Sequence, residues 1–305
     1  MRAVWSFWSK PYLAGRGGVW RAPHHHLLAW ALSLRVARAH YPDTALVTDT
    51  AGKAILVDHL GLSFSQVSTE LDALRDEDAG WWALGKLYAY SVQDAPFVHI
   101  DSDVFLWKPL PRNMTDAPVF AQCPELHPPL DTWSPPRDIE AAFAKHGLSL
   151  PVEWEWARSF GSEVYREENC GVVGGQDVGF LRHYAHSALR LVRDPAHRRA
   201  WCEIPCKDGY NMRVEQMMLA ACVDYHRSHP GSPWHGVRIR YLFPDFAGAF
   251  DPARAAQAGY THLLGDSKRN AAVAQRLEQR VRGEDRDCYE RCVRLGARLA
   301  QGAFA

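Results

Sequence analysis

The 305-residue sequence lacks a net charge, because 35 lysines and arginines balance 35 aspartates and glutamates. This balance argues against a dedicated nucleic-acid or membrane-surface binder, although a local basic groove remains open. Apolar runs of transmembrane length are also absent, and the first apolar stretch is interrupted at Lys10 and Pro11, too early for a secretory signal. We therefore expect a cytoplasmic protein without a transmembrane segment.

Cysteines are few, and their placement does not predict a disulfide framework. The seven cysteines are an odd number scattered over the last two thirds of the chain, which favours free thiols. Cys202 with Cys206 and Cys288 with Cys292 have a spacing that a metal could use, but neither pair has the Cys-x-x-Cys pattern. Cys288 and Cys292 share a helical stripe with Leu295, so buried packing is favoured over zinc.

Internal repeats are absent as well, and we expect one domain over residues 1–305. Strand-like runs alternate with helix-like patterns, which predicts an α/β fold with a mixed, mostly parallel central sheet flanked by helices. The expected strands lie at about 3–8, 45–48, 97–100 and 169–175, and the expected helices at about 24–40, 81–90, 176–192, 212–225 and 271–299. The adjacent histidines His24 to His26 mark a helix start, because neighbouring helical side chains diverge and cannot all face one ion.

Two segments depart from this alternation. Residues from about 123 to 160 are rich in proline and tryptophan, with one helix-like patch near Ile139. Such a segment is typical of an insertion over a site, where aromatic faces stack on sugar rings, although packing against the core is the alternative for most of these tryptophans. Residues from about 271 to 305 predict a charged helical extension that is broken near Gly283.

The segment FVHIDSDVFLW, residues 97–107, joins an apolar run to two carboxylates, Asp101 and Asp103. A strand that ends in carboxylates places hard oxygen ligands where an α/β sheet opens toward a ligand. An Asp-x-Asp pair by itself is more often a solvated turn or a cap. Its position between two apolar runs favours a site for a divalent cation and a phosphate.

A second segment, THLLGDSK at residues 261–268, places His262, Gly265 and Lys268 at three-residue intervals. Histidine completes a coordination shell of the manganese type, glycine lets the backbone approach a diphosphate, and lysine neutralises charge on a departing phosphate. Taken singly, His262 is a loop histidine and Lys268 a surface lysine. Together with the two aspartates they form a consistent cation and diphosphate set.

The order of these motifs resembles the glycogenin-like family 8 glycosyltransferases, which have a GT-A (Rossmann-like) fold, and their bacterial relatives. In that family an Asp-x-Asp ends a central strand, an asparagine and glycine segment lines the sugar pocket, an acidic-Gln pair begins a helix, and a His-x-x-Gly-x-x-Lys closes over the diphosphate. The matching residues here are Asp101, Asp103, Asn169, Gly171, Glu215, Gln216, His262, Gly265 and Lys268. The resemblance covers roughly residues 1–270. It departs at Glu215, where aspartate is usual, and after Lys268, where Pro-Trp is common.

The resemblance implies a hexosyltransferase that moves a sugar from a nucleoside diphosphate donor, with a UDP-sugar as the first candidate, and retains the anomeric configuration. The expected ligands of Mn²⁺ or Mg²⁺ are Asp101, Asp103 and His262, and the residues expected at the reacting centre are Asn169, Glu215, Gln216 and Lys268. The expected donor contacts are Ser6, Thr48, Asp49, Lys86, Ser102, Gly265 and Lys268. A helix-surface position is the alternative for Lys86, and a capping role at a strand end is the alternative for Ser6, Thr48 and Asp49.

Other functions stay open on the sequence alone. A nucleotidyltransferase of similar fold also uses aspartates and a metal on nucleotide phosphates, but its glycine-rich signature follows the first strand directly, whereas Gly15 to Gly18 come later. A non-catalytic sugar-nucleotide-binding protein would bind the donor without turnover. An inverting reaction would need a carboxylate base, for which Glu215 and Glu163 are the candidates. The acceptor, whether peptide, protein, glycan or small metabolite, is not specified by these motifs.

Overall fold

A computed structural model describes residues 1–128, 134–161 and 164–302. Trp133 of the proline- and tryptophan-rich segment and the candidate base Glu163 lie outside these residues. Among the described helices, none combines the length and the apolar character that a membrane crossing requires.

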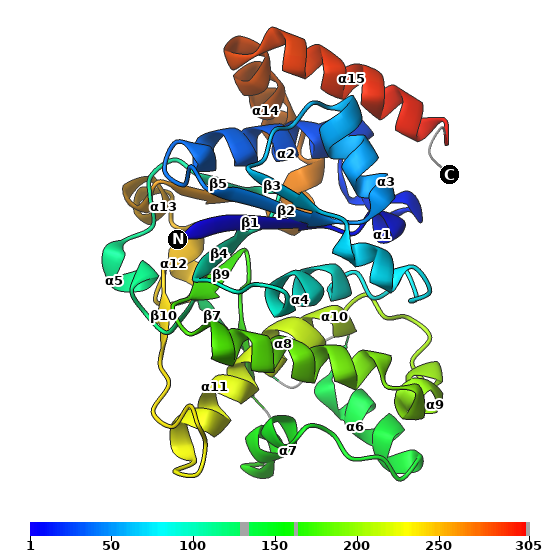
Figure 1. Cartoon of the computed structure of the whole chain (residues 1–305), viewed down its shortest axis with the longest axis vertical. Coiled ribbons are helices and arrows are strands. Elements are labelled where there is room, and N and C mark those ends of the chain that lie inside the picture. Colours follow the sequence, from blue (N-terminus) through cyan, green and yellow to red (C-terminus); the bar gives the residue numbers. More distant parts are fainter. Residues whose placement is uncertain (129–133, 162–163, 303–305) are drawn as a thin grey trace. The chain divides into compact units, whose positions relative to one another are not determined.

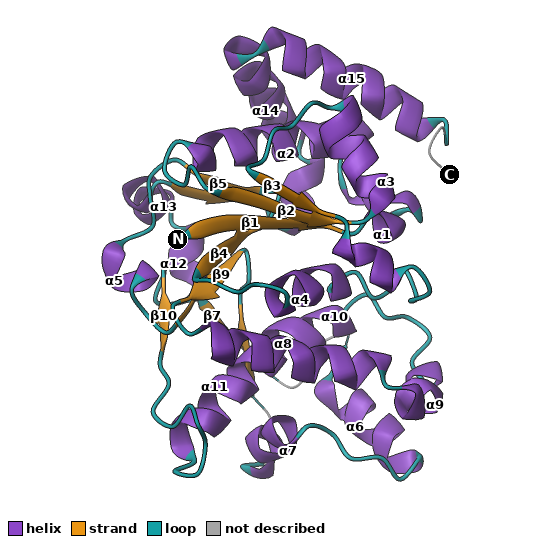
Figure 2. Ribbon diagram, in the orientation of Figure 1, coloured by secondary structure: helices purple, strands orange, loops and turns teal. Residues whose placement is uncertain are grey.

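Seven strands form a mixed sheet in the order β10-β6-β9-β4-β1-β2-β3 (Figure 1 and Figure 2). Strand β1 pairs with β2, β2 with β3 and β10 with β6 in parallel, whereas β6 and β9 are antiparallel. The expected α/β fold with a mostly parallel sheet and flanking helices is therefore confirmed. The bounds of these strands are β1 Arg2–Phe7, β2 Thr44–Thr48, β3 Gln66–Ser68, β4 Phe97–Ile100, β6 Val119–Ala121, β9 Val172–Gly175 and β10 Ile239–Tyr241.

The chain divides into two compact units. Unit 1 comprises residues 1–79, 98–110 and 252–305, and unit 2 comprises residues 80–97 and 111–251. The single domain expected over residues 1–305 stays a prediction.

The helices of unit 1 are α1 Ser9–Leu13, η1 Arg16–Val19, α2 Pro23–Arg38, α3 Thr50–Lys53, η2 Ala54–His59, η3 Glu70–Leu74, α13 Pro252–Ala258, η6 Gly265–Arg269, α14 Ala271–Glu284 and α15 Arg286–Ala300. Those of unit 2 are α4 Leu84–Ser91, α5 Arg112–Thr115, α6 Pro136–Lys145, α7 Val152–Ser159, α8 Val178–Arg193, η4 Pro195–His197, α9 Arg198–Cys202, α10 Tyr210–Met212, η5 Arg213–Met217, α11 Met218–Ser228 and α12 Phe246–Phe250.

In unit 1 the sheet packs against α2, and α15 packs against α2 in turn. Trp5 on β1 is fully buried, and its indole N–H donates to the hydroxyl of Ser33 on α2 at 3.1 Å. Helix α2 begins at Pro23. A backbone N–H in the first turn of a helix has no intrahelical acceptor, so proline costs no hydrogen bond there. A side chain at Gly296 on α15 would collide with the backbone of His24, so glycine permits this close contact between the two helices.

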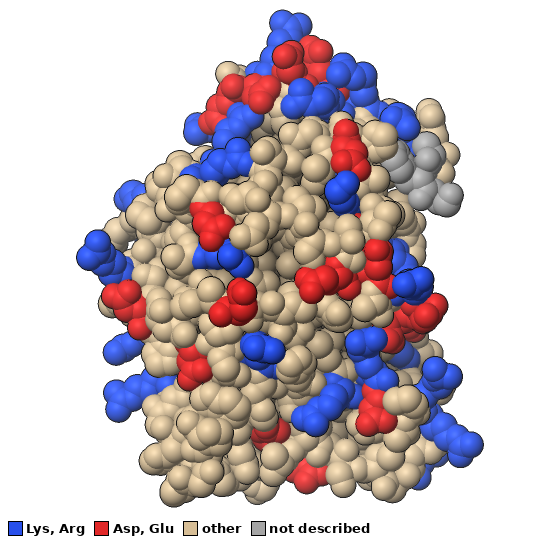
Figure 3. Space-filling view, viewed as in Figure 1, with Lys and Arg blue, Asp and Glu red and all other residues tan. Residues whose placement is uncertain are grey.

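Charged side chains of both signs cover α14 and α15 on the face that Figure 3 shows. Arg280 with Glu284 and Arg286 with Glu290 are ion pairs four residues apart, which support an exposed helix by a few tenths of a kcal/mol each. The expected charged extension is therefore a pair of helices. Its break falls at Asp285, two residues after Gly283 and so near the expected position, where the Asp285 side chain accepts the Cys288 N–H as the N-cap of α15.

A small antiparallel sheet in unit 1 joins β5, Val104–Leu106, to β11, Tyr260–His262. In its register His262 lies opposite Val104, the residue that follows the Asp-x-Asp. Two motifs about 160 residues apart in the chain are thereby brought to the same place.

In unit 2 the expected strand at 169–175 is shorter and begins at Val172. Side chains at Gly174 and Gly175 would collide with the backbone of Phe97 and of Pro118, which confirms that small residues here allow close approach of the backbone.

The proline- and tryptophan-rich segment contains more regular structure than one helix-like patch. Besides α6, which holds Ile139, it forms helix α7 and strand β7, Pro124–His127, which pairs with β8, Tyr165–Glu168. The sequence analysis missed β7 because its partly exposed Glu and His residues hide the alternation of a strand. Trp154 on α7 is fully buried and donates to Glu140 on α6, so packing explains this tryptophan.

Candidate active site

The first element of the site is the turn that links β4 to β5. Strand β4 is fully buried, and the backbone turns directly after it, with the Val104 N–H donating to the Asp101 carbonyl at 2.9 Å. The two carboxylates therefore stand at the carboxyl end of a buried strand, as expected. The Asp103 side chain is nearly buried at 10% exposure, whereas that of Asp101 is 24% exposed.

Strand β11 supplies the third ligand candidate. The Leu263 N–H donates to the Asp103 carbonyl at 3.0 Å, which continues the β5–β11 pairing and fixes His262 beside the turn. His262 Nε2 lies 3.5 Å from Asp103 Oδ1. One ligand atom from each of Asp101, Asp103 and His262 lies within 4.8 Å of the other two, so the structure brings this predicted set together.

Lys268 completes the cluster from η6. Its ammonium lies 2.5 Å from Asp103 Oδ2 and 5.7 Å from the centroid of the Trp20 ring. Gly265 begins η6 with φ of +49°, a left-handed conformation that favours glycine, and open space surrounds the position of its missing side chain. The Arg21 N–H donates to the Lys268 carbonyl at 3.1 Å and ties η6 to the start of α2.

Electrostatics keep Asp103 ionised. Burial opposes ionisation, but the charges of Lys268 and His262 and their hydrogen bonds outweigh it and hold the pKa of Asp103 well below its ordinary value. Asp103 is therefore an anionic oxygen ligand at every pH near neutrality.

The side chains at this cluster are suited to a divalent cation. Two carboxylates and one imidazole are a donor set suited to Mn²⁺ or Mg²⁺, and a cation already accompanies Asp103 in the form of the Lys268 ammonium. The side chains of Asp101 and Lys268 are each at least one fifth exposed, so a cation can reach Asp101 and an anion can reach Lys268.

The sequence analysis missed His99, although it lies only two residues before Asp101. His99 is buried on β4, with Nδ1 3.7 Å from Asp101 Oδ1 and Nε2 2.9 Å from the hydroxyl of Ser6 on β1. Ser6, expected at the donor, is therefore linked to the turn that carries Asp101 and Asp103 through His99. A polar residue inside an apolar strand was the available signal.

His26 was likewise treated only as part of a helix start. Burial, followed by the charge of Lys268, lowers the pKa of His26 to about 3, so the ring is neutral. Trp30 donates to His26 Nε2 at 3.1 Å, and the rings of Tyr12 and Trp20 lie 4.7 Å and 5.8 Å from it. These four rings form an uncharged aromatic wall in unit 1.

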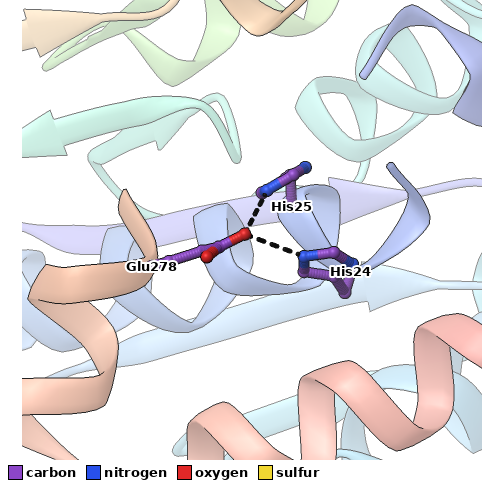
Figure 4. Close-up of side chains that lie close together, drawn as sticks. All are labelled: His24, His25 and Glu278. Carbon is purple, nitrogen blue, oxygen red and sulfur yellow. Dashed lines mark hydrogen bonds and ion pairs between the residues drawn. The ribbon is translucent and has the colours of Figure 1, made fainter. Parts of the chain in front are cut away.

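The other two adjacent histidines, His24 and His25, contact a carboxylate on α14. Helix α2 does begin here, but His24 and His25 both direct Nε2 to one oxygen of Glu278 on α14, at 3.1 Å and 2.7 Å (Figure 4). Two of the three neighbouring rings thus converge on one carboxylate, while His26 turns away.

Thr48 and Asp49 make the capping contacts that were the alternative to donor binding. The Thr48 hydroxyl donates to the Phe7 carbonyl at 2.6 Å. Asp49 accepts from the backbone N–H and the hydroxyl of Ser9 at 3.0 Å and 2.7 Å, and from the Gly52 N–H at 2.7 Å. These bonds join the ends of β1 and β2 to α3, and the donor role of both residues stays a prediction.

Apart from Ser102, the remaining predicted residues belong to unit 2, where Lys86 and Glu215 meet. Lys86 Nζ lies 2.9 Å from Glu215 Oε1, and Tyr90 donates to the same oxygen at 2.9 Å. Glu215 is fully buried and Lys86 is only 12% exposed, so Lys86 is not on the helix surface. Gln216, the next residue on the π-helical turn η5, is partly exposed.

Asn169 is also buried and bonded within unit 2. Its amide donates to Glu125 Oε1 at 2.5 Å, and its Oδ1 accepts the Gly171 N–H at 3.0 Å. Glu125, which the sequence analysis did not select, thereby becomes part of this group. Ser102 lies in the turn between the two aspartates and is partly exposed.

Fold and site define an α/β protein whose central sheet carries a carboxylate and histidine cluster at the end of a strand. The chain belongs to the family described as "Family of unknown function (DUF6734)", whose model matches residues 1–295. A search of curated proteins found no match. Among solved structures, a galactosyltransferase, LgtC, in complex with donor and acceptor sugar analogues is similar, with 13% identity, a TM-score of 0.39, and coverage of 97% of this chain and 95% of that chain. A similarity at this level supports no inference about activity.

Proposed function

We propose that the protein is a metal-dependent glycosyltransferase that moves a hexose from a nucleoside diphosphate donor, a UDP-sugar first, to an acceptor with retention of configuration. The observation that carries the proposal is the convergence of Asp101, His262 and Lys268 on Asp103. Carboxylates, an imidazole and an ammonium at one point suit a diphosphate with its counterion better than any uncharged ligand.

Asp101, Asp103 and His262 would hold Mn²⁺ or Mg²⁺. When bound, the cation supplies Lewis-acid stabilisation of the charge on the diphosphate. Lys268, held beside Asp103 by an ion pair, neutralises charge that develops on the departing phosphate oxygen. The left-handed turn at Gly265, with open space beside it, lets the backbone lie close to the diphosphate.

On the sugar side we assign contact to Gln216 and positioning to its neighbours. Gln216 is partly exposed, so its amide is accessible to a ligand hydroxyl. Glu215 is fully buried and bonded to Lys86 and Tyr90, which suits a residue that fixes the π-helical turn. Asn169 orders the backbone before β9 through its bonds to Glu125 and Gly171.

The test is release of nucleoside diphosphate from a panel of UDP-, GDP- and dTDP-sugars, with and without Mn²⁺. We expect metal-dependent release from one donor and a fall of at least about 1,000-fold in Asp103→Asn, which removes the charge at nearly constant volume. Asp287→Asn, on the exposed face of α15, is the matched control and should retain full activity. Circular dichroism checks that both variants fold.

Absence of release from every donor, together with no donor-induced shift in Tm, would overturn the proposal. Donor binding without turnover would indicate a sugar-nucleotide-binding protein. Release of pyrophosphate from nucleoside triphosphates would indicate a nucleotidyltransferase.

A further inference from the structure

Unit 2 contains a second cluster of metal-ligand types that takes no part in the proposed transfer. It consists of Glu153 on α7, His183 on α8 and His226 on α11, one residue from each of three helices. The side chains of Glu153 and His226 are 4% and 7% exposed, whereas that of His183 is 28% exposed. The sequence analysis did not find this cluster, because its members are separated by 30 and 43 residues.

Three ligand atoms of this cluster form a small triangle. His183 Nε2 lies 2.8 Å from Glu153 Oε1 and 3.0 Å from His226 Nε2, and His226 Nε2 lies 3.4 Å from Glu153 Oε1. Ligand atoms on one face of a tetrahedral zinc site, with bonds of about 2.0 to 2.2 Å, are separated by about 3.3 Å. The triangle is close to the spacing that such an ion would impose.

Hydrogen bonding does not by itself account for the triangle when both rings are neutral. The proton on His183 Nε2 can be donated to Glu153 Oε1 or to His226 Nε2. The lone pairs of Glu153 Oε1 and His226 Nε2 then face each other with no proton between them. A cation at the centre would accept a lone pair from each of the three atoms. The group of His24, His25 and Glu278 differs, because each ring can donate its own proton to the carboxylate oxygen.

The surroundings orient the two rings for coordination through Nε2. His226 Nδ1 lies 2.6 Å from the Ser232 hydroxyl, so a proton on Nδ1 donated to that oxygen leaves Nε2 with its lone pair free of hydrogen. The Ser232 hydroxyl is itself fixed by the Trp234 N–H at 3.0 Å. The Trp234 ring lies 4.7 Å from the ring of His183 and 5.1 Å from that of His226, which excludes water from one side.

One member of the cluster borders a surface cavity. His183 lines a surface cavity of about 820 Å³ together with Ser91, Val92 and Arg190. His183, 28% exposed, is therefore the member of the cluster that solvent reaches.

We propose that Glu153, His183 and His226 bind Zn²⁺, with water as the fourth ligand, and that the ion fastens α7 to α8 and α11. Two imidazoles and one carboxylate are a ligand set typical of zinc, and they differ from the oxygen-rich set at Asp101 and Asp103. Helix α7 is the last helix of the proline- and tryptophan-rich segment. Because zinc would bind the native arrangement of the three helices, its binding free energy would add to the stability with which this segment is held.

The test is a zinc titration of the full chain, stripped of metal, against a chromophoric chelator in excess Mg²⁺, which occupies oxygen-rich sites. We expect one tight equivalent in the wild type, weakened at least about 100-fold in His183→Gln and in Glu153→Gln. His186→Gln is the matched control, since His186 is exposed on α8 three residues from His183. Zn²⁺ should raise the Tm of the wild type and the control by several degrees and leave the other two variants unchanged.

Cobalt provides a readout that needs no variant. Co²⁺ in a four-coordinate site of the wild type should give visible absorption bands that Zn²⁺ displaces mole for mole. If His183→Gln does not fold, Glu153→Gln keeps the shape of the side chain and decides the question. Equal zinc affinity in Glu153→Gln and the wild type, or wild-type protein without a tight equivalent, would overturn the proposal. Asp103→Asn should lose the proposed transfer activity and retain the tight zinc equivalent. Failure of one proposal can therefore be distinguished from failure of the other.

Discussion

The sequence motifs point to two groups of charged side chains, one in each unit, and the two groups differ in how their charges are compensated. In unit 1, Asp103 pairs with Lys268, whose side chain is 20% exposed, and Asp101 stands at 24% exposure. In unit 2, Glu215 is fully buried and shares one oxygen with Lys86 and Tyr90. The first group is open to an incoming ligand at Asp101 and Lys268, whereas the second is closed on its own partners.

We expect the group in unit 1 to serve ligand binding and the group in unit 2 to serve stability. Removing one member of a fully buried ion pair leaves an uncompensated charge, which is costly for folding. In the first group Lys268 is partly exposed and His262 lies 3.5 Å from Asp103, so Asp103 keeps a neighbouring partner when Lys268 is lost, and the loss should affect ligand binding more than folding. Variants of the two groups should therefore fail in different assays.

The largest expected effect on stability is that of Glu215→Gln. This change leaves the Lys86 ammonium, on a side chain only 12% exposed, without its carboxylate and should lower the free energy of unfolding by about 3 to 5 kcal/mol. Urea denaturation followed by circular dichroism measures it. Glu203→Gln is the matched control, because Glu203 pairs with Lys145 at 2.8 Å on the surface of the same unit and its loss should have no measurable effect. Equal midpoints for both variants would contradict the comparison.

Lys268→Met should reverse this pattern. Loss of the ammonium should reduce donor turnover about 100-fold, or about 2.7 kcal/mol in transition-state stabilisation, with a smaller change in the urea midpoint than Glu215→Gln. The activity is measured as nucleoside diphosphate release. Arg269→Gln removes the neighbouring exposed charge and should retain activity. If both variants were equally active, Lys268 would have no role at the diphosphate.

The smallest expected effect concerns His127, which lies between two carboxylates in unit 2. Hydrogen bonds to Glu125 and Glu167 raise the pKa of His127 to about 9. A raised pKa contributes stability that is complete below the ordinary pKa of about 6.5 and disappears as pH rises through about 9. The wild type should lose roughly 1 to 2 kcal/mol between pH 7 and pH 10, after allowance for the partial exposure of the ring.

His127→Gln should remove most of this loss, because glutamine does not titrate. Urea midpoints across the pH range measure the difference between the two slopes. Parallel slopes would show that the ring does not hold its proton in the folded protein, and would weaken the view that charges in unit 2 serve stability.

Local patterns in the sequence were sufficient for the main elements near the site. The strand before Asp101 and helix α2 follow from apolar periodicity, which depends on a few neighbouring residues. The strand β7 and helix α7 were missed, because β7 is paired by a distant segment and its charged residues carry no alternation. The helical break near Gly283 was predicted, and the N-cap at Asp285 fixes its position within two residues of the glycine.

What the sequence by itself determined was the order of chemical groups: the Asp-x-Asp after an apolar run, and His262, Gly265 and Lys268 at a spacing suited to a diphosphate. Only the tertiary structure decided which charges meet. The pairing of β5 with β11 sets His262 beside Asp103, burial commits Glu215 to Lys86, and three helices bring together Glu153, His183 and His226. The physical reason is that periodicity is a short-range property, whereas compensation of a buried charge depends on contacts between segments far apart in the chain.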